Sequence, residues 1–209
     1  KEGGLSRIVR GSDGAAESLL YDCIRQGMAV AACHTNFDRS ALEVGHEVSA
    51  ALGAKIEGLL CDREDLGPSV QPIDIKKNSS VDPQSLGYGF FGGLGGKKSF
   101  EELAQCVKQL FEIESFLRTD PPPKTVSKIA FVAGKGASFL EPALELGCDV
   151  FITGEVGYHG ALFGKRKGAC VIEVGHRESE KFFPLVVEKW ITAMGIETVV
   201  ESVPTQQIG

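Results

Sequence analysis

Residues 129–160 read IAFVAGKGASFLEPALELGCDVFITGEVGYHG, and the segment alternates apolar runs with a helical pattern. Residues 128–133 and 150–153 are short apolar runs, as expected for strands that are buried on both faces. Between them, residues 139–146 have the length of a short helix that stops at Gly147, because glycine favours helix ends. A strand, a helix and a second strand in this order predict a parallel pair of strands.

The same alternation continues on both sides of this segment. Ser99 and Glu102 form the Ser-x-x-Glu pattern of a capping box, which predicts a helix from Ser99 to about Phe116. The other expected elements are helices at 15–27, about 41–52 and about 180–194, and strands at 28–33 and 170–174. The pattern predicts the α/β class, with largely parallel buried sheets and helices packed outside.

A glycine-rich run, GYGFFGGLGG, occupies residues 87–96. It lacks the Gly-Lys-Ser/Thr ending of a phosphate-binding P-loop, and no clear strand and helix flank it in the required order. We interpret it as a flexible turn or as a place of tight backbone packing, because glycine serves both purposes.

The composition excludes several classes of protein. The chain has 209 residues, 43% of them hydrophobic and 24% charged, and a net charge of −6, which argues against general nucleic-acid binding and anionic membranes. No apolar run approaches the roughly 20 residues of a membrane span. The six cysteines form no Cys-x-x-Cys pair, so we expect reduced thiols and a cytoplasmic or organelle-matrix location.

Three predicted strands end in polar clusters, at residues 34–38, 155–159 and 176–180. Three of the four histidines lie in these clusters, whereas His46 falls within a helix and is expected at its surface. Because the carboxyl ends of parallel strands meet at one sheet edge, the clusters could share a crevice. Each cluster alone is equally compatible with a turn, a helix cap or an exposed helical pair.

Glu180 comes four positions after His176, which directly follows an apolar run that ends at Gly175. If the chain is helical there, the imidazole nitrogen and the carboxylate oxygen share one helix face and can converge on one cation. Taken alone, two polar residues after a strand are more often a solvated loop.

The three motifs together resemble a known family. HTNFD at 34–38, FITGE at 151–155 with Tyr158 and His159, and GH at 175–176 with Ser179 and Glu180 occur in its order and spacing. The sequence resembles the dinuclear-metal family of GTP cyclohydrolase I type 2 homologues, also called NGG-interacting-factor-like proteins. The resemblance covers essentially the whole chain and implies two related α/β lobes, two divalent metals in the cleft between them, and a homohexamer.

The resemblance also implies roles for individual residues. Asp38, His176 and Glu180 match metal ligands, whereas His34, Glu155 and His159 match pocket residues near the metals, with catalytic roles in proton transfer. The family's His-His-Pro motif, which supplies two more ligands, is not found here. Either the chain lacks the beginning of the domain or the protein has lost half of its metal shell, so we expect one ion or none where the complete family site holds up to two. Residues 1–209 then form a single domain, with one lobe at about 1–54 and 175–209 and the other at about 55–174.

Two functions remain open from the sequence, beside the alternative of an α/β domain whose polar strand ends are solvated and hold no metal. The first is a metal-dependent hydrolase that acts on a small phosphorylated or nucleotide-like substrate with Zn, Mn or Fe, in the cytoplasm. The alternative is a non-catalytic metal- or ligand-binding protein with a regulatory or interaction role. The expected partners are a small-molecule substrate or ligand and further copies of the chain, with no membrane and no general nucleic-acid binding. The substrate cannot be read from the sequence.

Overall fold

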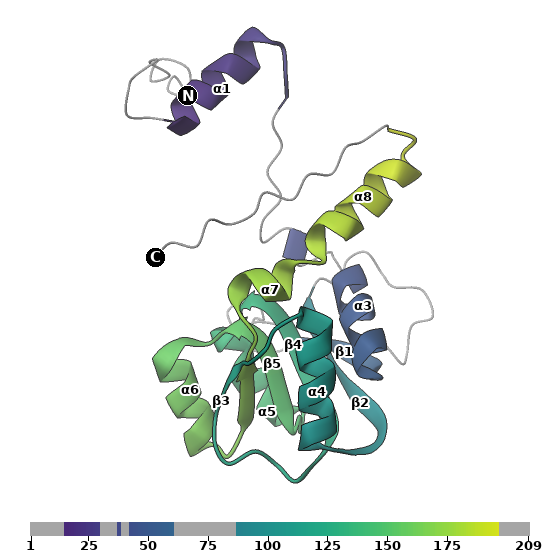
Figure 1. The fold of residues 1–209 in the computed structure, drawn as a ribbon, viewed down its shortest axis with the longest axis vertical. Coiled ribbons are helices and arrows are strands. Elements are labelled where there is room, and N and C mark those ends of the chain that lie inside the picture. The colour runs from purple at the N-terminus through teal and green to yellow at the C-terminus, as the bar shows by residue number, and fades with distance from the viewer. Residues whose placement is uncertain (1–14, 30–36, 39–41, 61–86, 197–209) are drawn as a thin grey trace, which may run out of the picture. The chain divides into compact units, whose positions relative to one another are not determined.

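The computed structural model describes residues 15–29, 37–38, 42–60 and 87–196 (Figure 1). The chain divides into two compact units, residues 1–34 and 35–209. In the first unit, helix α1 (Ala15–Arg25) is followed by Gly27 with a φ of +67°, which confirms the helix expected at 15–27. The second unit contains the sheet and the helices that pack on it.

A six-stranded mixed sheet forms the centre of the second unit, with the strand order β1-β2-β4-β5-β6-β3. Its strands are β1 (Lys55–Leu60), β2 (Tyr88–Ser99), β3 (Leu117–Arg118), β4 (Thr125–Lys135), β5 (Val150–Glu155) and β6 (Cys170–Glu173). Strands β4, β5 and β6 are mutually parallel, as the sequence predicted. The flanking strands β1, β2 and β3 pair antiparallel with their neighbours. The α/β class with a parallel core is therefore confirmed.

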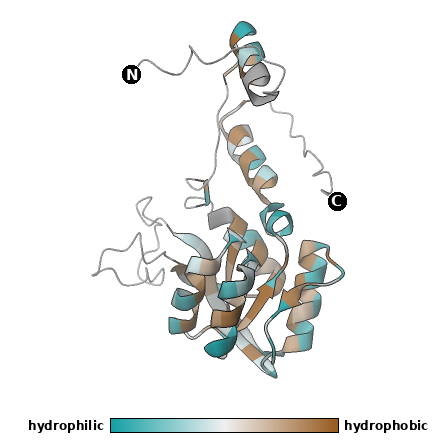
Figure 2. Ribbon diagram, turned by 90° about the vertical axis from the view of Figure 1, so that its left-hand side faces the viewer, coloured by the Kyte–Doolittle hydropathy of each residue, from teal (hydrophilic) through white to brown (hydrophobic). Residues whose placement is uncertain are grey.

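Helices cover both faces of this sheet (Figure 1). On one face lie α3 (Leu42–Leu52), α4 (Phe100–Phe111) and α8 (Phe183–Ala193). On the other lie the short turn η3 (Ala137–Phe139), α5 (Leu140–Glu145) and α6 (Gly157–Arg166). Figure 2 shows how strongly hydrophobic the central strands are between these layers.

Strand β4 is almost entirely apolar because both of its faces are covered by helices. Ile129 and Phe131 belong to the core beneath α3, α4 and α8, whereas Ala130 and Val132 belong to the core beneath α5 and α6. Successive side chains of a strand point to opposite faces, so a strand covered on both faces needs apolar residues at every position. All four side chains are buried.

The glycine-rich run forms most of strand β2, so its interpretation as a flexible turn was wrong and tight backbone packing was right. A Cβ atom at Gly92 would collide with the backbone carbonyl of Lys55 on β1. Glycine is weak in strands on average, but here close approach between backbones outweighs that preference.

The capping box at Ser99 is present, with the Ser99 hydroxyl accepting from the amide of Glu102 at 3.2 Å and the Ser99 amide donating to the Glu102 carboxylate at 2.8 Å. Helix α4 ends at Phe111 rather than Phe116, because Glu112 takes a left-handed conformation with a φ of 58°. The helix predicted at about 180–194 corresponds to α8, and a separate short helix, α7 (His176–Glu180), precedes it.

Several predictions concern residues whose structure is not described. Most of the strand expected at 28–33 and the whole of His34 lie outside the described ranges. The division into lobes at 1–54 with 175–209 and at 55–174 stays a prediction. None of the helices within the described ranges combines the length and apolar composition that a membrane crossing requires.

Candidate metal centre

The carboxyl ends of β4, β5 and β6 meet at one edge of the sheet, where helix α7 packs on β4 and β5. Glu155 is the last residue of β5, and His176 begins α7 three residues after the end of β6. The edge therefore brings together two of the three polar clusters that the sequence predicted, through the topology of a parallel sheet.

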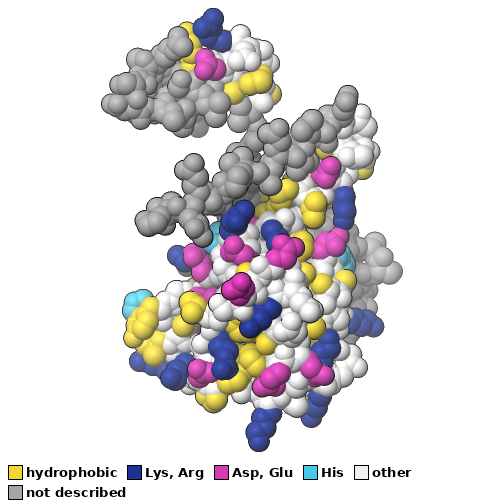
Figure 3. All heavy atoms as spheres, in the orientation of Figure 1, with side chains coloured by type: hydrophobic (Ala, Val, Ile, Leu, Met, Phe, Trp, Pro, Cys, Tyr) yellow, Lys and Arg dark blue, Asp and Glu magenta, His cyan; other side chains and the backbone are white. Residues whose placement is uncertain are grey.

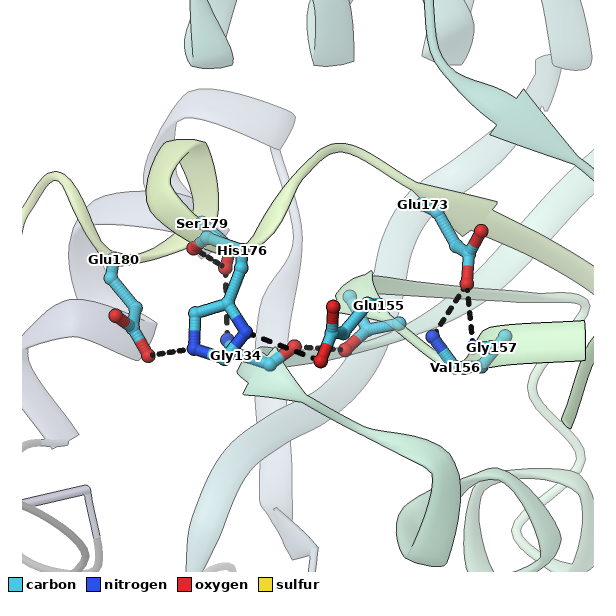
Figure 4. Close-up of polar contacts among 9 residues, drawn as sticks. Gly134, Glu155, Val156, Gly157, Glu173, His176, Ser179 and Glu180 are labelled. Carbon is cyan, nitrogen blue, oxygen red and sulfur yellow. Dashed lines mark hydrogen bonds and ion pairs between the residues drawn. The ribbon is translucent and has the colours of Figure 1, made fainter. Parts of the chain in front are cut away.

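His176 lies between two carboxylates at this edge (Figure 4). Its Nε2 atom is 3.1 Å from Oε1 of Glu180, and its Nδ1 atom is 3.5 Å from Oε1 of Glu155. The first contact follows from the i, i+4 spacing along α7, and the second joins α7 to the end of β5. The three side chains are 36–51% exposed, so a ligand can reach them from solvent.

Ser179 fastens the helix that carries His176 and Glu180. Its buried hydroxyl donates to the carbonyl of His176 at 2.7 Å and accepts from the amide of Gly134, at the end of β4, at 2.8 Å. Thr153, buried on β5, donates to the Gly134 carbonyl at 3.3 Å. Side-chain hydroxyls thus satisfy both backbone groups of Gly134, and α7 is held directly over the strand ends.

Gly154 allows α7 to approach this closely. A Cβ atom at Gly154 would lie 2.5 Å from the Gly134 carbonyl oxygen, 2.6 Å from the Ser179 hydroxyl and 3.0 Å from the Cα atom of His176. Any larger residue at this position would push the helix away from the sheet, because these neighbours are backbone or tightly bonded atoms.

Glu173 organises the adjoining part of the same edge. Its Oε1 atom accepts from the amides of Val156, at 2.5 Å, and Gly157, at 3.0 Å (Figure 4). These amides lie at the start of α6 and have no partner within the helix, so the carboxylate caps its N-terminus. No sequence pattern pointed to this residue, since nothing in its spacing reveals which helix it caps.

The remaining predicted site residues are placed differently. Asp38 is half-buried, and its neighbour Phe37 packs on Phe183 and Trp190 of α8, with ring centroids 4.9 and 5.2 Å apart. His159 is exposed on α6, with its ring 5.5 Å from that of Tyr158. His46 is exposed on α3, as expected.

His176 and Glu180 fit two positions of a metal shell. Two donors at about 2.1 Å from one ion lie roughly 3.0–3.4 Å apart, which includes the 3.1 Å between this nitrogen and oxygen. Glu155 faces the other ring nitrogen, where a carboxylate commonly orients a metal-binding histidine. Among the described residues, no three or more His, Cys, Asp or Glu side chains are grouped so that they could hold an ion.

A model of the family described as Duf34/NIF3 (NGG1p interacting factor 3) matches residues 7–206. The GTP cyclohydrolase 1 type 2 homolog of Streptococcus pneumoniae is 30% identical over 162 residues, which are 76% of this chain and 54% of that protein. The GTP cyclohydrolase 1 type 2 of Helicobacter pylori is 26% identical over 187 residues, covering 88% of this chain and 63% of the relative. The chain thus spans only about half to three-fifths of these relatives.

Solved structures share the fold. A Bacillus cereus protein related to NIF3 superposes with a TM-score of 0.70 at 15% identity, covering 98% of this chain and 80% of its own. Reduced HcgD from Methanocaldococcus jannaschii gives a TM-score of 0.63 at 18% identity, covering 88% and 65%.

Proposed function

This chain belongs to the Duf34/NIF3 family, and we propose that it binds a divalent metal and hydrolyses a small phosphorylated or nucleotide-like substrate. The observation that carries the proposal is His176, whose two ring nitrogens each face a carboxylate at the carboxyl edge of the sheet. The names of the relatives, GTP cyclohydrolase 1 type 2 and its homologs, also favour a nucleotide-directed hydrolase.

In this proposal, His176 and Glu180 bind the ion through Nε2 and Oε1. Asp38 would supply a further oxygen by its match to the family's motif, and its neighbour Phe37 packs on α8, which begins three positions after Glu180. Imidazole and carboxylate ligands suit Zn, Mn and Fe. A second ion and a homohexamer, both implied by the resemblance, belong to the same proposal.

Glu155 has a separate role from Glu180. It faces Nδ1 of His176, so it orients the ring and increases the electron density on Nε2, as carboxylates behind metal-binding histidines do. At half exposure it can also accept a proton from an attacking water molecule. His159 and His34 are the other proposed proton-transfer groups.

A bound divalent ion supplies a Lewis acid that activates water and stabilises the developing negative charge. The chain's own contribution is geometric. Ser179 and Gly134 fix the start of α7, and Gly154 permits its close approach, so His176 and Glu180 are held before any ligand arrives. Such preorganisation lowers the reorganisation that binding and reaction require.

The test combines metal analysis with a hydrolysis panel. Wild-type protein, the double variant Asp38→Ala/His176→Ala and the control His46→Ala are loaded with Zn, Mn or Fe and analysed for bound metal. Each is then assayed on nucleoside mono- and triphosphates and on simple phosphoesters. We expect the double variant to lose both metal and turnover, and the exposed-histidine control to keep both.

Two results would argue against the proposal in different ways. Unchanged turnover by a metal-free double variant would remove the metal-dependent mechanism. Stoichiometric metal without turnover of any substrate would leave a metal-binding protein with a regulatory or interaction role.

A further inference from the structure

A cavity of about 460 Å³ lies beside the candidate metal centre, between edge strand β3 and the start of α6. This volume falls within the range of small-molecule sites, about 300–1,000 Å³. Its walls are mainly carbon, from Leu117, Val156, Ala161 and Val171. Two charged side chains also line it, Glu173 and Arg118, and the guanidinium of Arg118 is already paired with Asp120 at 2.9 Å. The cavity adjoins the metal centre in the sequence, because Val156, which lines the cavity, directly follows Glu155.

Two large side chains stand exposed among the lining residues. Tyr158 is 75% exposed and Leu117 is 71% exposed. Hydrophobic side chains also reach the surface beside α6 on the face drawn in Figure 3, among interspersed acidic and basic groups. Apolar surface beside a cavity favours a flat, apolar ligand, because covering it removes that surface from water.

Glu173 adds one directional polar group to this wall. Its Oε1 atom is held by the amides of Val156 and Gly157, which fixes the orientation of the carboxylate. Its Oε2 atom has no hydrogen-bond partner among the residues that the structure describes. By contrast, the hydroxyl of Thr119 is fully used, because it accepts from the Val171 amide and donates to the Ala169 carbonyl. The carboxylate is therefore an oriented acceptor for an N–H group.

We propose that this cavity binds the nucleobase of the substrate. The base packs against Tyr158 and Leu117, and a ring N–H or amino group donates to Oε2 of Glu173, while the phosphorylated part reaches His176. The inference rests on the proposed function and narrows its substrate class from phosphorylated molecules in general to nucleosides and nucleotides. The base is the occupant that uses both the apolar wall and the single carboxylate acceptor.

The experiment separates base binding from the metal centre by using ligands without phosphate. Guanosine, uridine and ribose are titrated by calorimetry into the full chain, into His176→Ala and into two pocket variants, Tyr158→Ala and Glu173→Gln. The second pocket substitution keeps an oxygen for the two amides but replaces Oε2 by an N–H donor. Leu185→Ala, an exposed apolar residue on α8, is the control.

We expect at least one nucleoside to bind much more tightly than ribose, equally in the wild type, His176→Ala and Leu185→Ala. Glu173→Gln should weaken that binding roughly 10- to 100-fold, because a charge-assisted hydrogen bond is replaced by a repulsive contact. Tyr158→Ala should weaken it roughly 10-fold through lost stacking. Circular dichroism checks that both variants remain folded.

Nucleosides that bind no better than ribose would overturn the inference, whatever the metal analysis shows. So would a change of sedimentation coefficient in Tyr158→Ala without nucleoside binding, because the cavity would then be a contact between copies of the chain. Nucleoside binding by a protein without metal or turnover would uphold the inference while the proposed hydrolase fails.

Discussion

The imidazole of His176 and the carboxylate of Glu180 lie 3.1 Å apart, one turn from each other on a helix of only five residues. So short a helix has little stability of its own, because the first turn costs more conformational entropy than its hydrogen bonds return. Its geometry therefore depends on the sheet beneath it, through Ser179, Gly134 and Gly154.

Metal binding by the variants Glu180→Gln and Glu155→Gln should differ, because Glu180 is proposed as a metal ligand and Glu155 as the residue that orients the ligand His176. Loss of the Glu180 carboxylate should nearly abolish metal binding, because it removes a donor. Loss of the Glu155 carboxylate should weaken metal binding about 10- to 100-fold, the usual effect of removing a partner behind a ligand. Competition titration with a chromogenic chelator measures both, and equal effects would contradict the assignment.

Ser179→Ala should destabilise the fold by about 1–3 kcal/mol, since it leaves the amide of Gly134 without its partner in a buried position. Ser49→Ala is the matched control. Ser49 is also buried, but its hydroxyl donates only to the carbonyl of His46 within the same helix, so we expect a loss below about 1 kcal/mol. Urea unfolding measures both changes, and similar losses would show that Ser179 does not fasten α7.

The capping box gives a defined pH dependence. Hydrogen bonds from the amide and hydroxyl of Ser99 lower the pKa of Glu102 from its ordinary value of 4.5. Its contribution to stability is therefore present above pH 4.5 and is lost as the pH falls through the lower pKa of the folded state. Glu102→Gln should be less stable than the wild type at pH 7, and the difference should shrink toward pH 3. A constant difference in unfolding free energy across this range would contradict the prediction.

Two buried cysteines make the stability of the fold fall at high pH, whereas Glu102 makes it fall at low pH. Burial raises the pKa of Cys148 to about 12 and that of Cys170 to about 11, from an ordinary value of 9.0. Their contribution to stability is complete below pH 9 and is lost as the pH rises toward these values, because the unfolded chain releases the protons first. The double variant Cys148→Ala/Cys170→Ala should show a flatter decline between pH 8.5 and 10.5.

Thiol labelling of the folded protein at pH 8 provides an independent check on the same two residues. Both thiols are buried and protonated, so neither should react before unfolding, and peptide mapping identifies the modified sites. Rapid modification of Cys148 or Cys170 in the native protein would disprove their burial.

The part of the site that local spacing controls could be predicted from sequence. Glu180 follows His176 by four positions, which places both side chains on one helix face. Strand ends in a parallel sheet meet at one edge, which brings Glu155 to His176. Ser179 and Glu173 could not be assigned in this way, because their partners, Gly134 and Val156, lie 45 and 17 residues away.

Strand β2 shows a second limit of sequence reasoning. Position 92 requires glycine because the backbone of Lys55 on the neighbouring strand leaves no room for a side chain. This requirement arises only when the sheet is assembled, so the segment alone does not reveal it. The end of α4 is a related case, since Glu112 terminates the helix in a conformation that glycine or asparagine usually occupies.

The amide proton of Gly134, which is hydrogen-bonded to the Ser179 hydroxyl, reports whether α7 is attached to the sheet. That amide can exchange with heavy water only when α7 lifts from the sheet, so its protection factor measures the free energy of detaching His176 and Glu180 together. A ligand that bridges α7 to the strand ends should slow this exchange event increasingly as its affinity rises. It should also raise the melting temperature, because it binds only the folded state in which α7 is attached.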